Sequence, residues 1–542
     1  MDLYDKLVDY SQSDVYPFHM PGHKRQVWNP FLQEFPNPYA IDITEIDGFD
    51  NLHHAEGIIR ESMDWAAKMY GADRSYYLVN GSSCGILSAV CGMTQHGGKI
   101  LMSRNCHKAA YHGVFLNRLR VEYIYPQIIE EFGIQGGLVP EDVEQVLKTD
   151  HDIQAVLVVS PTYDGIVSDV EKIVEICHGC GIPLIVDEAH GAHFRYHKGF
   201  PVSALDLGAD VVIQSLHKTL PAFTQTSILH VKGDLVDRER LEHYLQIFQS
   251  SSPSYLFMAG MERCLKFMEE NKGAEEENVG EGEKGKVEAS GKENEKEKTE
   301  MTGERSRMDQ FYHRLVKLRK ELGAMKRLRL LEEDQKGKNG VYDLDISKVI
   351  ISTRGTGING EELGEWLRRE YHLEMEMCAA EYVTAITTVM DTEEGLRRLR
   401  NALLKLDEKF DEKPGKMAEN QPYVINEQKN SDCAETVEAL TNDHGRDCKE
   451  HWALTSLCGE SQNAVMTIAD GWEQADEKIP LENSAGRISG EYIYLYPPGI
   501  PFVVPGEQIS QDVVDLVKRY QECGYSVQGM ADKSCKEIRV VK

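Results

Sequence analysis

The chain has 542 residues, of which 41% are hydrophobic and 27% are charged, and its formal net charge is −29 at pH 7. This length is too great for one ordinary hydrophobic core and predicts several folded units. The composition is that of a globular protein and excludes a wholly disordered chain. So negative a charge argues against a nucleic-acid partner, because neutralising phosphates requires clustered Lys and Arg.

The N-terminal segment carries scattered charges and lacks the apolar stretch of a secretory signal. No run of about eighteen apolar residues occurs, so we expect no membrane-spanning helix and a cytoplasmic protein. The 12 cysteines are dispersed along the chain and form no compact disulfide framework. Reduced thiols in a cytosolic protein are therefore the simpler expectation.

Apolar, strand-like runs alternate with helix-like stretches between about Ala66 and Val231. This alternation predicts an α/β domain with a parallel or mostly parallel sheet, covered by helices on both faces. Ligands of such sheets bind beyond the carboxyl ends of the strands, so the residues after each run are the first candidates for a site. The predicted strands are 99–103, 121–126, 154–160, 182–188, 210–215 and 227–231.

The rest of the chain divides by composition. The segment 271–309 holds twelve acidic and eight basic residues and scarcely an apolar one, which predicts a disordered acidic insertion. A second polar stretch, 411–450, predicts a linker. The amphipathic runs GEELGEWLRREYH and TEEGLRRLRNALLKL between these segments predict a smaller domain containing helices. The expected layout is an N-terminal arm at 1–60, a large ligand-binding domain at 61–270, a small α/β domain at 310–410 and a C-terminal α+β domain at 451–542.

Lys218 lies in QSLHKTLPAFTQ, a few residues after the predicted strand 210–215. A lysine at the carboxyl end of a strand can point into the ligand crevice and form an imine with an aldehyde cofactor. Taken alone, such a lysine is more often a solvated surface charge. The hypothesis therefore needs a partner for the cofactor elsewhere in the sheet.

Asp187 ends the run IPLIVD and offers that partner. Pyridoxal phosphate requires a carboxylate beside its pyridine nitrogen, because a protonated ring withdraws electrons from a substrate carbanion more strongly. A turn or helix-cap aspartate is the alternative for this position. Asp187 and Lys218 together favour the cofactor.

Two serines supply a candidate phosphate site. Ser82 and Ser83 follow Gly81 in VNGSSCGILSAV, directly before a helix-like apolar stretch. Backbone N–H groups at a helix N-terminus, together with two hydroxyls, bind an anion well. An ordinary serine N-cap is the simpler explanation of this pair when it is considered alone.

Further candidates follow other predicted strands. His107, in SRNCHKAAYHG, could stack its ring on the pyridine, although alone it would be considered a surface loop histidine. SPTYDG offers Ser160, Thr162 and Tyr163 after the strand 154–160, and Gly165 allows a tight turn there. Each of these residues is ambiguous when taken singly.

Together these segments resemble the bacterial ornithine/lysine/arginine decarboxylase family, which has the fold type I of the aspartate aminotransferases. The resemblance begins with HMPGHKR and DITEIDGFDNLHHAEG and continues through NGSS, RNCHK, SPTYDG, VDEAHGAH and SLHK. It ends in GRISGEYIYLYPPGIPFVVPGE, whose many prolines predict an ordered extended loop. It covers nearly the whole chain outside the two polar segments.

The resemblance implies a large domain with a mostly parallel, seven-stranded type of sheet, and it assigns roles to individual residues. Lys218 would be the Schiff-base lysine, Asp187 the pyridinium partner and His107 the stacking residue. Ser82, Ser83, Ser215 and His217 would lie around the phosphate. Thr162 and His190 would lie near the cofactor, and the catalytic residues would be Lys218, His107 and His190.

The resemblance also implies an assembly and a substrate. Family members work as homodimers or multiples of dimers with interface active sites, so HMPGHKR and the segment near Ser252 would approach a neighbour's site. The chain resembles the shorter biosynthetic type that lacks an N-terminal wing domain. The expected reaction is the decarboxylation of a basic amino acid, arginine first and then lysine or ornithine, to a polyamine precursor. Aminotransfer is the alternative, with Arg354 as a possible carboxylate clamp.

Two other interpretations compete with this one. VDEAH also occurs in DEAH-box ATPases, but the nearest phosphate-loop match, from Gly280, lacks the final Ser or Thr and follows no strand. Cys177 and Cys180 have metal-like spacing, yet no second pair follows at zinc-finger distance, and we expect no metal. A pseudoenzyme that keeps the fold without turnover is a third possibility, which an assay for amine or carbon dioxide release would test.

Overall fold

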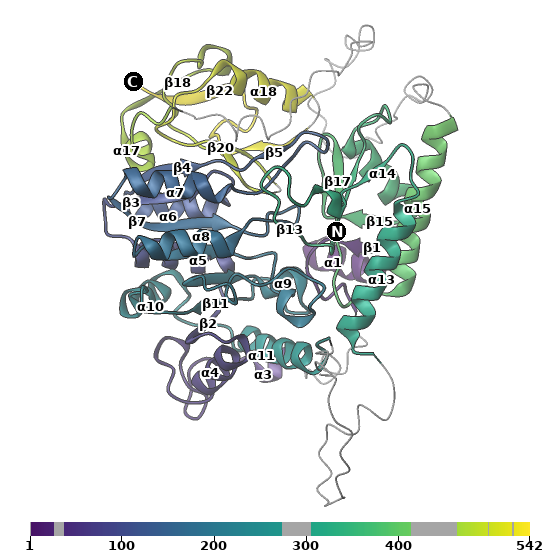
Figure 1. Ribbon diagram of the computed structural model, residues 1–542, viewed down its shortest axis with the longest axis horizontal. Coiled ribbons are helices and arrows are strands. Elements are labelled where there is room, and N and C mark those ends of the chain that lie inside the picture. The colour runs from purple at the N-terminus through teal and green to yellow at the C-terminus, as the bar shows by residue number, and fades with distance from the viewer. Residues whose placement is uncertain (1, 27–36, 274–304, 413–462, 497, 523–524) are drawn as a thin grey trace, which may run out of the picture.

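The computed structural model describes residues 2–26, 37–273, 305–412, 463–496, 498–522 and 525–542. Most of the predicted insertion 271–309, most of the predicted linker 411–450 and the phosphate-loop-like run from Gly280 lie outside these residues. The described chain forms three units. The first contains the large sheet, the second follows it in the chain, and the C-terminal unit is drawn in yellow (Figure 1).

A seven-stranded sheet in the order β2-β11-β10-β9-β7-β3-β4 forms the centre of the molecule. Neighbours from β10 to β4 are parallel, whereas β11 runs antiparallel to both β10 and β2. The predicted mostly parallel sheet is confirmed, and β2 is the strand that the apolar runs did not reveal. The strands are β2 (Arg74–Leu78), β3 (Lys99–Ser103), β4 (Arg120–Ile124), β7 (Ile153–Val159), β9 (Leu184–Asp187), β10 (Val211–Gln214) and β11 (Ser227–Val231).

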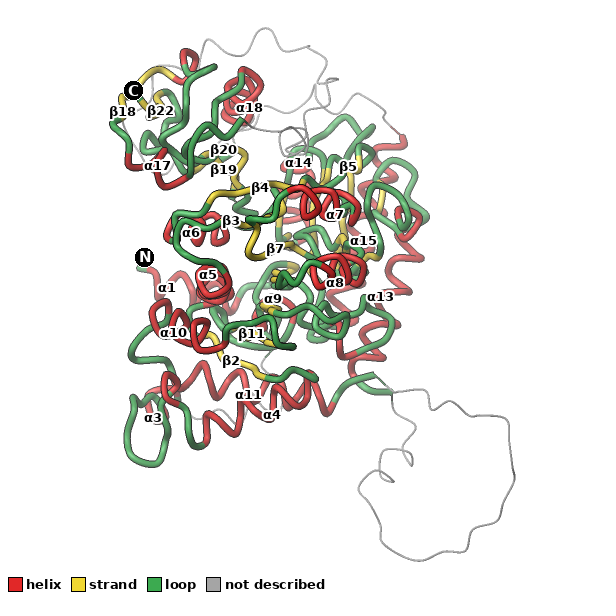
Figure 2. Tube along the Cα trace, turned by 60° about the vertical axis from the view of Figure 1, so that its left-hand side comes forward, coloured by secondary structure: helices red, strands yellow, loops and turns green. Residues whose placement is uncertain are grey.

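Both faces of this sheet are buried, because successive side chains of each strand enter opposite cores. In β10, for example, Val212 belongs to one apolar cluster, and Val211 and Ile213 belong to the other. Helices cover the sheet on both sides (Figure 2). They are α5 (Gly81–Met93), α6 (Lys108–Leu116) and α10 (Arg238–Phe248) on one face and α4 (Ile58–Tyr70), α7 (Pro140–Thr149), α8 (Val170–Gly179) and α11 (Tyr255–Glu270) on the other.

A second unit contains the sheet β12-β14-β17-β16 and has its own apolar cluster. The two predicted amphipathic helices are present in it and bury one face each, as Leu363 and Leu399 illustrate. Its elements are α13 (Arg307–Leu322), β12 (Arg329–Leu330), β14 (Lys348–Ser352), α14 (Gly360–Tyr371), β16 (Met377–Cys378), β17 (Tyr382–Ile386) and α15 (Glu393–Glu412).

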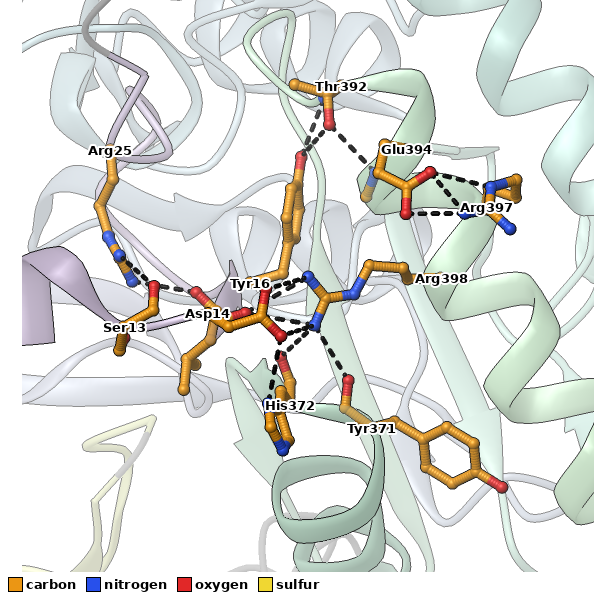
Figure 3. Close-up of polar contacts among 12 residues, drawn as sticks. Ser13, Asp14, Tyr16, Arg25, Tyr371, His372, Thr392, Glu394, Arg397 and Arg398 are labelled. Carbon is orange, nitrogen blue, oxygen red and sulfur yellow. Dashed lines mark hydrogen bonds and ion pairs between the residues drawn. The ribbon is translucent and has the colours of Figure 1, made fainter.

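The N-terminal segment packs on this second unit. After α1 (Leu3–Gln12), strand β1 (Tyr16–Phe18) pairs in parallel with β15 (Leu373–Met375). The Arg398 guanidinium contacts the Asp14 carboxylate and donates to the carbonyl oxygens of Tyr371 and His372 (Figure 3). The N-terminal segment, the C-terminal end of α14 and helix α15 are therefore joined by one arginine. A short helix, α3 (Pro38–Ile41), follows farther along the chain.

The C-terminal unit has a two-stranded and a three-stranded sheet, β18-β22 and β20-β19-β21. A buried ion pair between Arg104 and Glu507 joins it to the large sheet, with 3.3 Å between Nη2 and Oε2. No helix in the described parts of the chain is long and apolar enough to cross a membrane. The elements are α17 (Ile468–Glu473), β18 (Asp476–Pro480), β19 (Ile493–Leu495), β20 (Pro501–Val503), α18 (Gln511–Glu522), β21 (Val527–Gln528) and β22 (Glu537–Val541).

Candidate active site

Lys218 lies in the short helix α9 (Leu216–Thr219), which begins two residues after β10 ends. Its Nζ is 3.0 Å from His190 Nε2. Burial lowers the pKa of Lys218, and the negative charges of Asp187 and Glu376 oppose this shift. Burial and the charge of Lys218 hold the pKa of His190 well below its usual value. The pair therefore favours a neutral imidazole beside an amine that gives up its proton readily.

Asp187 is the last residue of β9. It therefore lies at the carboxyl ends of the parallel strands, where α9 also begins. Ile213 of β10 pairs in register with Asp187, so the two parallel strands deliver Asp187 and Lys218 to the same crevice. The Asp187 carboxylate is buried and accepts a hydrogen bond from the backbone N–H of Ala189 at 3.1 Å. Burial raises the pKa of Asp187, and Lys218 opposes that shift.

His107 is the N-cap of α6, and its Nδ1 accepts a hydrogen bond from the backbone N–H of Ala109 at 3.2 Å. Burial and then the Lys218 charge lower the pKa of His107 to about 3. Gly499 of the C-terminal unit lies against the ring, since a Cβ there would be 3.4 Å from His107 Nε2. The backbone N–H of Lys108 donates to the Gly499 carbonyl at 3.0 Å. The neutral imidazole ring of His107 is thus held in one orientation by the proline-rich loop that contains Gly499.

The predicted phosphate residues come from two elements that meet at the loop around Gln225. The Gln225 amide donates to the Val79 carbonyl just before α5, and His217 Nδ1 is 2.8 Å from the Thr226 carbonyl. Burial lowers the pKa of His217 to about 4. Ser82 is half-buried and Ser83 exposed at the N-terminus of α5. The segment that contains Ser252 lies beside them in the same chain, because Ser250 N donates to Asn80 Oδ1.

In the turn after β7, Tyr163 contacts His190, whereas the Thr162 side chain bonds within the turn. The Thr162 hydroxyl accepts from the backbone N–H of Ile166 at 3.1 Å and so closes its own turn. The Tyr163 ring lies 5.0 Å from the His190 ring, edge to face. The Tyr163 hydroxyl donates to Glu376 Oε1 at 2.6 Å. Glu376, between β15 and β16, was not predicted from sequence.

The HMPGHKR segment contacts α9 of its own chain. The backbone N–H of Gly22 donates to the His217 carbonyl at 2.7 Å, and a Cβ at Gly22 would clash with the backbone of Leu220. The buried Lys24 ammonium donates to the carbonyl oxygens of His19 and Ile386. Whether this segment also approaches a neighbouring subunit stays a prediction.

A cavity of about 770 Å³ adjoins these residues, between the large sheet, the second unit and the C-terminal unit. Its wall includes Thr162, Tyr163 and Glu376 on one side and residues of α14 on another. Carboxylates are frequent in this wall and favour a cationic ligand. They are Asp164, Glu361, Glu362, Glu365, Glu374, Glu376 and Glu381.

The residues behind the competing interpretations have other partners. Glu188 of VDEAH accepts hydrogen bonds from the Ser203 hydroxyl, the Ala204 N–H and the Gln214 amide, which is a structural arrangement. His193 bonds to Asp345, and His197 to Asp309, so the two rings diverge from His190. Arg354 contacts the Glu381 carboxylate and the Glu130 carbonyl. Its guanidinium already has partners in the protein, which does not favour the aminotransferase clamp.

The crevice fits pyridoxal phosphate by the polar atoms that it leaves unpaired. Ser215 Oγ, in a fully buried residue at the N-cap of α9, has no hydrogen-bond partner in the described chain. Thr219 Oγ1 and His190 Nδ1 are likewise buried and without a partner there. Buried polar groups normally find partners, so a polar ligand between α9 and β9 would satisfy them.

The sequence comparisons agree with this geometry. A model of the Orn/Lys/Arg decarboxylase major domain matches residues 1–394, and a model of the C-terminal domain of the same enzymes matches residues 454–533. This chain belongs to the Orn/Lys/Arg decarboxylase family. Membership makes it a decarboxylase and implies pyridoxal phosphate as its cofactor.

Individual relatives span the whole chain. Arginine decarboxylase of Bacillus anthracis is 29% identical over 544 residues, covering 100% of this chain and 97% of its own length. Lysine decarboxylase of Hafnia alvei is 25% identical, covering 93% of this chain and 72% of its own length. The crystal structure of the Francisella novicida lysine decarboxylase LdcF superposes with a TM-score of 0.70 at 20% identity, over 99% of this chain and 80% of that one. This last likeness concerns the fold alone.

Proposed function

We propose that this chain decarboxylates a basic amino acid, with arginine as the first candidate and lysine or ornithine next. Family membership and the full-length similarity to arginine decarboxylases support this function. The observation that carries it is the meeting of Lys218 and Asp187 at the ends of adjacent parallel strands, with Lys218 Nζ 3.0 Å from His190. The product would be an amine such as agmatine or cadaverine, a precursor for polyamine biosynthesis.

In this proposal Lys218 would hold the cofactor in the crevice. Asp187 would face its pyridine nitrogen and His107 would cover the ring, while Thr162 and His190 would line the surroundings. The phosphate would be held at the N-terminus of α5 and by α9, where N–H groups and unpaired hydroxyls are available. These residues are Ser82, Ser83, Ser215 and His217.

Bound pyridoxal phosphate supplies an electron sink for the bond between the α-carbon and the carboxylate. The chain contributes the electrostatics. A buried carboxylate at Asp187 would stabilise positive charge on the ring nitrogen of the bound cofactor, because opposite charges interact strongly where water is excluded. Neutral His107 presents a flat face without placing a second positive charge there.

The proton that replaces the carboxylate comes from Lys218 or His190 in this proposal. Lys218 Nζ and His190 Nε2 are within hydrogen-bond distance, so a proton can pass between them. Burial moves the pKa values of both groups downward. A lysine whose pKa is lowered toward neutrality is a better proton donor than an exposed one.

The proposal extends to architecture and assembly. The large domain would be of pyridoxal-phosphate fold type I, followed by the small and C-terminal domains predicted from the sequence. We propose a cytoplasmic homodimer or a multiple of dimers with active sites near the subunit interface. The exposed Ser252 segment beside α5 and the N-terminal segment beside α9 are the surfaces through which a neighbour could complete the site.

The function is tested with the purified protein and added pyridoxal phosphate. Arginine, lysine and ornithine are supplied in turn, and carbon dioxide and the amine product are quantified. We expect equal amounts of carbon dioxide and amine from one preferred substrate. The Lys218→Ala variant should lose the visible absorbance of the covalently attached cofactor, and its kcat should fall by at least about 10³-fold because the attachment and the proton donor are both removed.

Lys172→Ala is the matched control, because Lys172 is an exposed lysine on α8. It should keep both the absorbance and the turnover of the wild type. Keto-acid formation in place of carbon dioxide would identify an aminotransferase. A wild-type protein that binds no B6 vitamer would refute the proposal.

A further inference from the structure

Two buried polar atoms in the cavity wall have no hydrogen-bond partner among the described residues. They are Asn105 Oδ1 and Asp164 Oδ1. Asn105 is 4% exposed and Asp164 is 8% exposed. Buried polar groups without partners are rare in folded proteins, because leaving one unsatisfied is destabilising. The wall of this cavity is therefore incomplete without a ligand that donates hydrogen bonds.

Both residues lie near the reaction centre. Asn105 follows β3 and Asp164 follows β7, which are parallel neighbours in the central sheet. The carboxyl ends of β9 and β10, where Asp187 and Lys218 emerge, lie along the same edge. Asn105 is two residues before His107, and Asp164 directly follows Tyr163, which contacts His190. A substrate reacting at Lys218 can thus extend its side chain into the cavity between them.

Among the described residues, no cation forms an ion pair with the Asp164 carboxylate. The Tyr382 hydroxyl bonds to the carboxyl group, and Tyr163 and Lys348 are its other titratable neighbours. The Lys348 ammonium, however, is 2.9 Å from Asp345 Oδ2, and this buried pair occupies it. Burial raises the pKa of Asp164 to about 7. An ionised carboxylate in such a place is stabilised by an incoming cation.

Other carboxylates of the cavity have partners in the protein. Glu376 accepts from the Tyr163 hydroxyl and from the backbone N–H of Met20. Glu381 contacts Arg354, and Glu365 contacts Arg368. Burial combined with an unpaired oxygen therefore distinguishes Asp164 from them.

We propose that Asp164 and Asn105 form the subsite that binds the distal cation of the basic amino acid. Asp164 supplies the negative charge, and the Asn105 carbonyl supplies a second acceptor. Guanidinium and ammonium groups have only donors, so they complement two acceptors, whereas an aliphatic side chain leaves both unpaired. This inference rests on the proposed function, because it names the residues that select the substrate of that reaction.

The test compares a cationic with a neutral ligand. In the holoenzyme, Asp164→Asn keeps the size of the side chain but removes its charge and replaces one acceptor oxygen with an NH₂ donor. For the preferred basic substrate, kcat/KM should fall about 10-fold to 100-fold, the range expected for a hydrogen bond to a charged group. Binding of norvaline, which lacks the cation, should change by less than about threefold on the same scale.

The pH profile separates a charge effect from a structural one. KM of the wild type for the basic substrate should rise as the pH falls below about 7, because protonation of Asp164 removes the charge that binds the cation. The Asp164→Asn variant lacks this rise. Asn105→Leu, which removes the side-chain amide but no charge, should weaken binding of the basic substrate and leave the rise in place.

Two charge-matched controls complete the experiment. Glu171→Gln changes an exposed residue in the first turn of α8 and should leave the preference for the basic substrate intact. Glu361→Gln changes a carboxylate elsewhere in the cavity wall. If Glu361→Gln reduces the preference for the basic substrate as much as Asp164→Asn does, the cation is attracted by the wall carboxylates together, and the inference is overturned. An unchanged preference for the basic substrate in Asp164→Asn also overturns it.

Failure of the proposed function has a different signature. In that case the wild type releases no carbon dioxide from any basic amino acid. Calorimetric titration with arginine and norvaline then decides the inference without turnover. Tighter binding of arginine that is lost in Asp164→Asn supports the subsite, and equal binding of the two ligands refutes it.

Discussion

At the scale of single residues, the site depends on groups that burial keeps neutral. His107 and His190 have lowered pKa values because the surrounding protein removes water from their charged forms. The same effect acts at His230 in β11. His230 is fully buried, its Nδ1 is 2.7 Å from Ser75 Oγ, and its ring lies 4.2 Å from that of Tyr70.

His230 predicts a loss of stability in mild acid. Burial lowers its folded-state pKa to about 3, whereas the unfolded chain has the ordinary value of 6.5. Between these values only the unfolded state binds the proton, so stability falls as the pH drops, by at most about 1.4 kcal/mol per pH unit. In His230→Phe this contribution is absent. The advantage of the wild type over the variant should therefore shrink between pH 7.5 and pH 5.5 in urea unfolding.

His151→Phe is the control, because His151 is exposed after α7. Its pH dependence should follow that of the wild type. If the free energies of unfolding of the wild type and of His230→Phe differ by the same amount at pH 7.5 and pH 5.5, His230 is not held neutral.

Sequence could place Lys218 and Asp187 because each follows a recognisable strand, and parallel strands end at one edge. It could not place Glu376, which reaches Tyr163 from another unit. Nor could it show that Gly499 lies against His107, since almost 400 residues separate them. Contacts between distant segments depend on how units pack, and neither periodicity nor spacing contains that information.

At the scale of elements, apolar patterning located the strands that are buried on both faces. It missed β2, whose sequence RSYYL begins with polar residues and is only partly buried. The amphipathic patterns of α14 and α15 were sufficient for both helices. The exact packing of α14 was not predictable, because it depends on a close backbone approach at its first residue, Gly360.

We expect substitution by alanine to have opposite effects on stability at Gly360 and at Gly179. A Cβ at Gly360 would lie far inside contact distance of the backbone oxygens of Ala379 and Tyr382, so Gly360→Ala should destabilise the protein by about 1–3 kcal/mol. Gly179 ends α8 and has open space around it. Gly179→Ala should be neutral or stabilise by up to about 1 kcal/mol, because alanine favours helix. Thermal unfolding of both variants measures the difference.

Because α14 forms part of the cavity wall, Gly360→Ala should also raise KM for the basic substrate, whereas Gly179→Ala should not. Equal melting temperatures for the two variants would mean that α14 can move away from β17 without loss. The close approach would then have no role in stability.

At the scale of the whole molecule, the crevice is bounded by all three units. The second unit contributes Glu376, and the C-terminal unit contributes the loop behind His107. Arg104 connects that loop to the large sheet, since its guanidinium donates to the Pro501 carbonyl at 2.6 Å and pairs with Glu507. Both partners of the ion pair are 1% exposed, so neither charge can be hydrated if the other is lost.

Glu507→Ala should therefore destabilise the protein by about 3–5 kcal/mol, because it leaves the Arg104 charge buried beside an uncharged residue. The proline-rich loop that lies against His107 should lose its orientation at the same time, and we expect kcat to fall while the cofactor stays bound. Arg104→Met combined with Glu507→Leu removes both charges and replaces them with apolar volume. This double variant should recover most of the melting temperature, since a buried pair contributes little net stability over a packed apolar pair. Thermal unfolding and limited proteolysis between the units measure both variants, and a Glu507→Ala protein as stable as the wild type would show that the C-terminal unit is held by other contacts.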